Sequence, residues 1–213
     1  MLNARNRRPS EVQWKGKRVS TGIFKQPVAD RVVVRRLNLD GDRQADLTVH
    51  GGEEKAVYAY PAEHYDYWRQ ELPNVALPWG MFGENLTTCG LLEDAVNVGD
   101  RFRVGAALLQ ATQPRLPCYK LGVKFGREDM IRRFLASERY GWYFAVVEEG
   151  EIGADDTIER VHRDPHDLTV ADIARLYLHE RDNQAMMQRA LTHEGLPAGW
   201  RAYFQERLEQ RTG

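Results

Sequence analysis

Short apolar stretches separated by glycine, aspartate and proline occupy most of the chain up to residue 163. β-Branched and aromatic residues favour extended backbone, and glycine and aspartate favour the turns between strands. The strands predicted in this way cover residues 31–35, 46–50, 95–98, 101–104, 107–113 and 141–148. Many short strands with few helices are typical of a barrel or a sandwich.

Two segments within this β-rich part have helical spacing instead. In residues 61–72, Tyr65, Trp68 and Leu72 recur on one face, and Pro61 suits the first helical turn. The second predicted helix covers residues 127–137. We therefore expect a mainly β domain with occasional helices over residues 1–163.

Residues 164–213 have a different, helical pattern. Thr169 and Asp172 have the spacing of a capping box, in which Asp172 replaces the usual glutamate or glutamine. A second helix is predicted over residues 183–193, and a third begins at Pro197. Helices this short are marginal in isolation, so they must pack on one another or on the β-rich part. We expect a small three-helix domain over residues 164–213.

The composition argues against several classes of partner. The chain has 213 residues and a formal net charge of −1, from 30 lysines and arginines against 31 aspartates and glutamates. A nucleic-acid or anionic-membrane surface depends on a net positive field, which this balance does not supply. No run approaches the roughly 20 apolar residues of a membrane span, and residues 1–20 lack the apolar core of a secretory signal. We expect a cytoplasmic protein without a nucleic-acid or membrane partner.

The two cysteines, Cys89 and Cys118, limit the thiol chemistry. They are too few for a framework of several disulfides or for a site with four thiolates, and a single disulfide between them stays open. Residues 113–118, Gln-Pro-Arg-Leu-Pro-Cys, place Cys118 in a proline-stiffened loop directly after a predicted strand. Because a thiolate is a soft metal ligand, this loop predicts a metal-binding thiol.

Arg115 supports a functional interpretation of that loop. A guanidinium is costly to bury without a partner, lowers the pKa of a nearby thiol, and can hold a phosphate with two hydrogen bonds. The alternative is a buried, inert Cys118, which is a common situation for cysteines outside disulfides. Cys89 has no comparable neighbours and is interpreted as structural.

Three other segments carry groups that can bind a polar ligand. Gly51 and Gly52 let backbone N–H groups approach an anionic or heteroaromatic ligand, and His50 and Lys55 add hydrogen bonds and positive charge. In the other two segments, Glu84 and Asn85 can bind a polar ring or position a water, and Thr21 and Gly22 can hold a phosphate. An ordinary turn is the alternative for the Gly51-Gly52 segment, where it follows a strand, and for the Glu84-Asn85 segment. No dinucleotide fingerprint, P-loop, zinc-binding His-Glu-x-x-His or Gly-x-Ser-x-Gly motif is present.

Taken together, these segments resemble the MOSC domain family and, within it, the YiiM-like subfamily. The resemblance covers roughly residues 18–210 and rests on the following residues: Thr21-Gly22-Ile23-x-Lys25, Asp42 with Asp46-x3-His50-Gly51-Gly52-x2-Lys55-Ala56, Gly83-Glu84-Asn85-Leu86, Val98-Gly99-Asp100, and Pro114-Arg115-x-Pro117-Cys118. It implies an α+β fold, mainly β, with a β-barrel core followed by a small three-helix domain.

The resemblance also implies a molybdenum–pterin cofactor (molybdenum bound to molybdopterin), with Cys118 as the metal ligand. By the same resemblance, the cofactor contacts are Thr21, Gly22, Asp46, His50, Gly51, Lys55, Asn85, Arg115 and Cys118. Similar proteins reduce N-hydroxylated compounds, such as 6-N-hydroxylaminopurine and amidoximes, to amines or amidines. His50 and Glu84 are the candidate proton donors in that reaction.

Some similar proteins carry an added iron–sulfur domain, whereas two cysteines cannot hold such a cluster. We therefore expect a separate flavin or iron–sulfur protein as the electron donor. The three-helix part either docks that donor or stabilises the fold or a homodimer. Three other functions stay open: sulfur transfer through a Cys118 persulfide, a non-catalytic cofactor carrier, and a purely structural Cys118.

Overall fold

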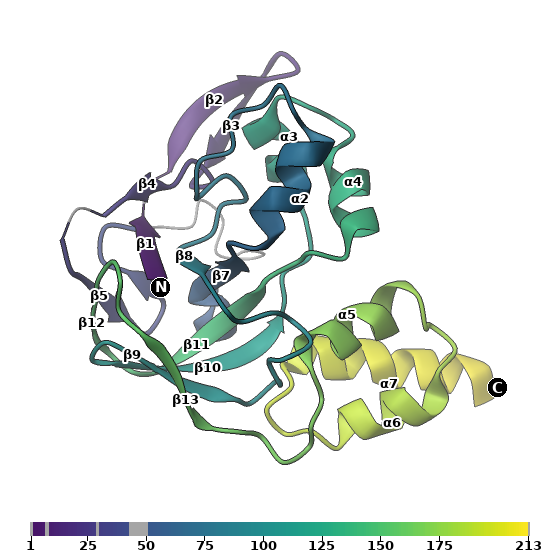
Figure 1. Cartoon of the computed structure of the whole chain (residues 1–213). Helices are drawn as coiled ribbons and strands as arrows, with labels where there is room; N and C mark the ends of the chain where they lie inside the picture. Colours follow the sequence, from purple (N-terminus) through teal and green to yellow (C-terminus); the bar gives the residue numbers. More distant parts are fainter. Residues whose placement is uncertain (1, 7–8, 29, 43–50, 213) are drawn as a thin grey trace.

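The computed structural model describes residues 2–6, 9–28, 30–42 and 51–212 (Figure 1). Its largest element is an eight-stranded sheet with the order β13-β9-β10-β11-β7-β8-β1-β4. In chain order these strands are β1 (Leu2–Asn6), β4 (Gln26–Pro27), β7 (Val57–Pro61), β8 (Leu86–Thr88), β9 (Arg101–Val104), β10 (Ala107–Pro114), β11 (Trp142–Glu148) and β13 (Ile158–His162). Neighbouring strands are antiparallel except β7 and β8, which run parallel.

The core is dominated by this sheet, as expected, but the β-barrel closure is not seen among the described residues. β13 and β4 end the strand order and do not pair with each other among the described residues. After β11 the chain turns into β12 (Gly150–Ile152), which pairs with β5 (Val32–Arg35) instead of extending the large sheet. β5 also pairs with β6 (Asn38–Leu39), and β2 (Ser10–Trp14) pairs with β3 (Lys17–Thr21) in a hairpin. The α+β class itself is confirmed.

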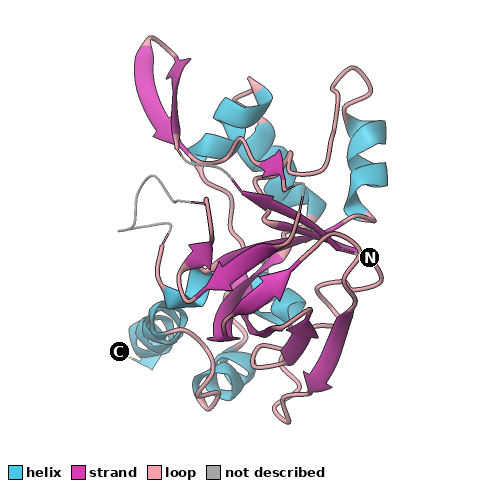
Figure 2. Cartoon of the chain, turned by 90° about the vertical axis from the view of Figure 1, so that its left-hand side faces the viewer, coloured by secondary structure: helices cyan, strands magenta, loops and turns pink. Residues whose placement is uncertain are grey.

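Helices lie in two groups beside the sheet (Figures 1 and 2). One group contains α2 (His64–Glu71), α3 (Tyr119–Phe125) and α4 (Met130–Ser137), which pack through an aromatic cluster that includes Tyr60, Trp68 and Phe82. The other contains α5 (Val170–Leu178), α6 (Gln184–Leu191) and α7 (Ala198–Thr212), which share a separate core. A short 3₁₀ helix, η1 (Glu53–Lys55), precedes β7.

Most predicted elements of the β-rich part are confirmed, with local corrections. β5, β9, β10 and β11 form where strands were expected, whereas residues 46–50 lie outside the described residues. Residues 95–98 are not a strand, because Asn97 makes only an isolated bridge and its N–H donates to the Asp100 side chain at 3.0 Å, closing a turn. Pro61 ends β7, and α2 begins only at His64.

The three C-terminal helices are confirmed. The Asp172 N–H donates to Thr169 Oγ1 and the Thr169 N–H donates to Asp172 Oδ2, both at 3.0 Å, so the capping box is present. The Asn183 side chain caps α6 by a single bond, accepting from the Met186 N–H at 3.1 Å. Among the described residues, none of the helices combines the length and apolar character that a membrane crossing requires. The domain boundary at residues 163 and 164 stays a prediction.

Candidate functional site

A cavity opens where β3, η1, β7 and the loop after β10 meet. This feature, called the cation pocket below, brings together segments that are far apart in the sequence. Its described lining residues are Thr21, Gly22, Ile23, Lys25, Asp42, Lys55, Tyr58, Phe82, Gly83, Asn85, Arg115, Cys118, Lys120 and Tyr143. Four of these residues are cations and one is a carboxylate, so the pocket favours an anionic ligand.

Arg115 is buried in the wall of the cation pocket. Its guanidinium carbon lies 5.3 Å from the centre of the Tyr58 ring and 5.2 Å from that of Phe134. Burial lowers the pKa of Arg115, but the nearby Tyr58, Tyr143 and Cys118 groups outweigh it, so the pKa is raised. Nη1 is buried and has no hydrogen-bond partner among the described residues. A buried charged donor of this kind fits an anionic group of a ligand.

Lys25 and Asp42 form a buried ion pair on another side of the pocket. The Lys25 ammonium donates to the two Asp42 oxygens at 2.6 and 2.5 Å. Burial lowers the pKa of Lys25, and the Asp42 charge opposes that shift without cancelling it. Asn85 Nδ2 also donates to Asp42 at 2.7 Å, while Asn85 Oδ1 accepts from the Tyr58 N–H at 3.1 Å. Asn85 thus orients the ion pair and links it to β7.

Cys118 lies at the end of β10's proline-flanked loop, immediately before α3. Its side chain is half-buried and lines the cation pocket. Neither Cys118 nor Cys89 forms a disulfide. The loop is tied to the sheet because the Arg115 N–H donates to the Gly141 carbonyl at 3.2 Å, just before β11. The thiol is therefore held on a braced segment, beside the buried guanidinium.

Glu84 occupies a different environment from the one expected of a proton donor. Its buried carboxylate accepts from the N–H groups of Gly80 at 2.5 Å and Phe82 at 3.1 Å. It also accepts from the hydroxyls of Thr87, at 3.1 Å, and Tyr65. Glu84 does not line the cation pocket. These contacts close the turn that carries Gly83, so the structure favours a role in shaping that turn.

The other expected contact residues fall into three groups. Thr21, Gly22 and Lys55 line the cation pocket. Gly51 is described, two residues before η1, and is not among the lining residues. The remaining two, Asp46 and His50, lie outside the described residues.

Several lining residues were missed by sequence reasoning. Lys120 is buried as the second residue of α3 and adds a cation to the pocket that Cys118 lines, and its position two residues after the thiol was the available signal. Tyr58 and Tyr143 lie on the paired strands β7 and β11, directly opposite each other. Their aromatic character suggested only a core, because the strand pattern does not show that they face a cavity.

The described donor set fits a molybdenum–pterin cofactor. Such a cofactor carries a phosphate, which matches the buried Arg115 guanidinium and its unsatisfied Nη1. Its metal takes soft ligands such as thiolates, which matches the Cys118 thiol in the same cavity. Gly83 keeps the cavity wall close, because a Cβ there would lie 2.7 Å from Ile23 Cγ1.

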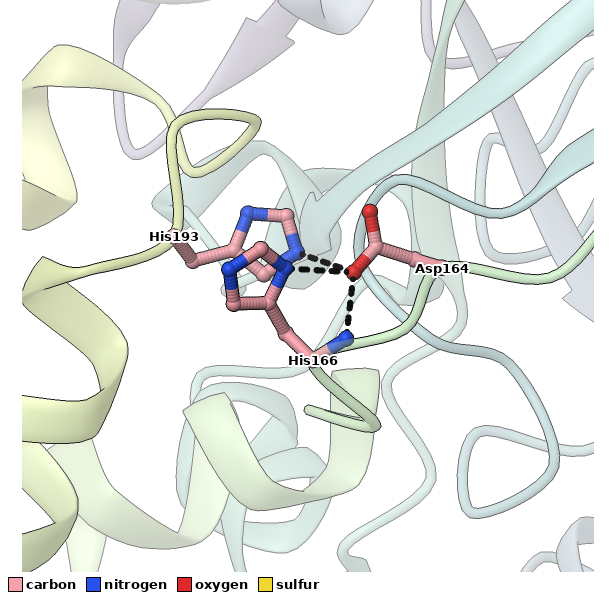
Figure 3. Close-up of side chains that lie close together, drawn as sticks. All are labelled: Asp164, His166 and His193. Carbon is pink, nitrogen blue, oxygen red and sulfur yellow. Dashed lines mark hydrogen bonds and ion pairs between the residues drawn. The ribbon is translucent and has the colours of Figure 1, made fainter.

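A second cluster, formed by Asp164, His166 and His193, resembles a metal site (Figure 3). Both imidazoles approach the Asp164 carboxylate, at 2.9 Å from His166 and 3.2 Å from His193. However, His193 Nδ1 accepts from the Gly195 N–H at 3.0 Å, so the ring hydrogen is on Nε2, which donates to the Val98 carbonyl at 2.9 Å. His193 then has no lone pair to offer a metal. The cluster instead ties the α6–α7 connection to the loop before β9.

Comparisons with known proteins cover both the β-rich part and the C-terminal helices. Residues 46–159 match the MOSC domain, and residues 168–211 match the YiiM-like, 3-alpha helix domain. The protein YiiM of Escherichia coli is 39% identical over 189 residues, which cover 88% of this chain and 84% of that protein. A protein of Gibberella moniliformis named "Reductase" is 32% identical over 164 residues, which cover 76% of this chain and 29% of that protein.

The fold comparison gives the same relationship. The crystal structure of YiiM from Geobacillus stearothermophilus has a TM-score of 0.82 and 36% identity, with 98% of this chain and 100% of that chain covered. Because the match covers 98% of this chain, it includes both the sheet and the three C-terminal helices. The chain belongs to the YiiM-like branch of the MOSC domain family.

Proposed function

We propose that this chain binds a molybdenum–pterin cofactor in the cation pocket and reduces N-hydroxylated compounds. The observation that carries the proposal is the shared cavity of Cys118 and Arg115, whose buried Nη1 has no partner among the described residues. MOSC domains are associated with this cofactor, and one relative is named as a reductase. Both facts support the proposal without specifying the substrate.

Each residue of the pocket has a proposed role in binding. The Cys118 thiolate is the protein ligand to the metal, and Arg115 and Lys120 hold the anionic part of the cofactor. Thr21 and Gly22, at the end of β3, and Lys55, at the end of η1, close the pocket around it. The Lys25–Asp42 pair keeps the pocket wall ordered through Asn85. When bound, the cofactor supplies two-electron oxidation–reduction chemistry.

The net reaction consumes two electrons and two protons, breaks the N–O bond, and releases the amine or amidine and water. We propose that His50, outside the described residues, or a water in the cavity brings a proton to the leaving oxygen. Glu84 is less suited, because four donors surround its carboxylate. The electrons come from a flavin or iron–sulfur reductase outside this chain, since two cysteines cannot hold a four-thiolate cluster.

The test compares Cys118→Ala with the matched variant Cys89→Ala, both produced in a host that makes the cofactor. Metal and pterin contents are measured on the purified proteins, together with benzamidoxime reduction by a chemical reductant. Wild type and Cys89→Ala are expected to contain molybdenum and to reduce the substrate, while Cys118→Ala loses reduction. Full reduction by Cys118→Ala would overturn the proposal.

Two further results would replace the proposed activity with another. A persulfide on Cys118 in protein that contains no molybdenum would support sulfur transfer. Bound cofactor that is released without turnover of any N-hydroxylated compound would support a carrier. Arg115→Gln adds an independent readout, because it should lower the pterin content even where no activity is assayed.

The cytoplasmic location also stays a prediction.

A further inference from the structure

A larger cavity, of about 420 Å³, lies directly beside the cation pocket. The two cavities share Lys55, Cys118 and Tyr143. We call the larger one the tail chamber, because the C-terminal helices form one of its walls. Its described lining residues are Glu54, Lys55, Gln113, Pro114, Leu116, Pro117, Cys118, Tyr143, Tyr177, Pro197, Gly199, Trp200 and Tyr203.

Three aromatic side chains from the C-terminal helices form the tail wall of this chamber. Tyr177 of α5 meets Trp200 of α7 edge to face, with ring centres 5.2 Å apart, and lies 4.9 Å from the Tyr203 ring. The Trp200 indole is held in place because its Nε1 donates to Gln113 Oε1 at 2.8 Å. The wall is therefore built from mutually packed rings, one of which is hydrogen-bonded to β10.

The braced loop that carries Cys118 forms another part of the lining. Pro114, Leu116 and Pro117 contribute apolar surface there, and Glu54 and Lys55 balance each other in charge. An apolar body bound in this chamber with its polar end at Cys118 would reach the cation pocket, because Cys118 is one of the three residues that line both cavities. A chamber of this volume and lining is typical of a small-molecule site.

We propose that the tail chamber is the substrate site and that Tyr177, Trp200 and Tyr203 make it selective for N-hydroxylated compounds built on a planar ring. This inference rests on the proposed reductase function. A flat ring gains contact area and favourable ring–ring geometry against an aromatic wall, whereas a small aliphatic hydroxylamine cannot fill it. The three-helix part is thus a component of the binding site, in addition to any role in stability.

The test uses Tyr203→Ala, with Gln205→Ala as the matched control. Both residues lie on α7, but Gln205 is exposed and bonds only to Glu209 among the described residues. Reduction of benzamidoxime and of acetamidoxime is measured on cofactor-containing protein with a chemical reductant. Tyr203→Ala should lower kcat/KM for benzamidoxime about tenfold, mainly through KM, and change acetamidoxime little. Gln205→Ala should change neither. An equal loss for both substrates, or none for either, would overturn the inference.

A binding measurement separates this inference from the proposed activity. Benzamidoxime is titrated calorimetrically into cofactor-containing protein without reductant, so that no turnover occurs. Weaker binding to Tyr203→Ala than to wild type, with no reduction by either, would retain the chamber and reject the reductase. Equal binding to both proteins, with reduction intact, would retain the reductase and reject the chamber.

Discussion

Trp200 Nε1 donates a hydrogen bond to Gln113 Oε1 at 2.8 Å, across 87 positions of the sequence. Trp200 lies in α7, and Gln113 lies near the end of β10, two residues before Arg115. The Gln113 side-chain amide also reaches the Glu54 carbonyl, at 3.4 Å. The position of the C-terminal helices is therefore coupled to the strand that leads into the Cys118 loop.

Trp200→Phe should destabilise the protein through this bond. The substitution keeps an aromatic ring but leaves the buried Gln113 oxygen without its donor, which costs about 1–2 kcal/mol in unfolding free energy. Urea unfolding measures the change. Adding Gln113→Leu to Trp200→Phe should recover part of the loss, because the unpaired oxygen is then removed too. Equal stability of wild type and Trp200→Phe would show that the bond contributes nothing.

Glu84→Gln should reduce stability more than catalysis. The carboxylate now accepts hydrogen bonds from Gly80, Phe82, Thr87 and Tyr65. In the glutamine variant an N–H₂ group replaces one of the two oxygens and cannot accept the bonds made to it. We expect a loss of about 2 kcal/mol in unfolding free energy and a nearly unchanged kcat of the folded protein. Thermal unfolding and steady-state kinetics on the same preparation test both parts. An unchanged melting temperature with a large drop in kcat would instead make Glu84 the proton donor.

Glu93 should make the unfolding free energy depend on pH in the acid range. Burial raises its pKa, but His64, at 2.8 Å, and the Gly141 N–H, at 2.7 Å, outweigh burial, so the pKa is lowered. Between the folded pKa and the unfolded value of about 4.3, the unfolded chain binds a proton that the native chain does not. The stabilisation is thus present above that range and lost as the pH falls through the folded pKa.

Glu93→Gln is the variant that isolates this effect. At neutral pH it should lower the unfolding free energy by about 3 kcal/mol, because His64 loses a buried partner. The difference from wild type should begin to shrink as the pH falls below the unfolded value of about 4.3, and it should vanish below the lowered folded pKa, where the wild-type carboxylate is protonated as well. Urea unfolding over this pH range measures it. A difference that is constant with pH would contradict the assignment.

Gly99→Ala should loosen the contact between the C-terminal helices and the sheet. Gly99 has a φ of +89°, and a Cβ there would lie 2.3 Å from Asp164 Oδ2, within the cluster drawn in Figure 3. Gly90→Ala is the matched control, since its φ is +76° but a Cβ meets nothing within 4 Å. Backbone strain alone costs about 1–3 kcal/mol, so both variants lose stability and Gly99→Ala loses more. Equal melting temperatures of the two variants would contradict this expectation.

Features that depend on neighbouring residues were predictable from the sequence. The capping box at Thr169 and Asp172 and the strand that leads into the Cys118 loop depend on side chains a few positions apart. Cys118, the candidate thiol, and Arg115, three residues before it, could be chosen for the same reason.

Only the tertiary structure decided how distant groups meet. Three features of the pocket exist only because several strands and a helix converge. They are the Lys25–Asp42 pair, the Arg115 Nη1 atom without a partner among the described residues, and the place of Lys120 in the pocket. The pairing of β12 with β5 in a separate small sheet is likewise not specified by the hydrophobic pattern of either strand. Local propensity determines which elements form, whereas burial and hydrogen bonding between distant elements determine which side chains share a cavity. For that reason the sequence predicted the thiol loop, whereas only the fold brought aromatic side chains of the C-terminal helices to a cavity that Cys118 also lines.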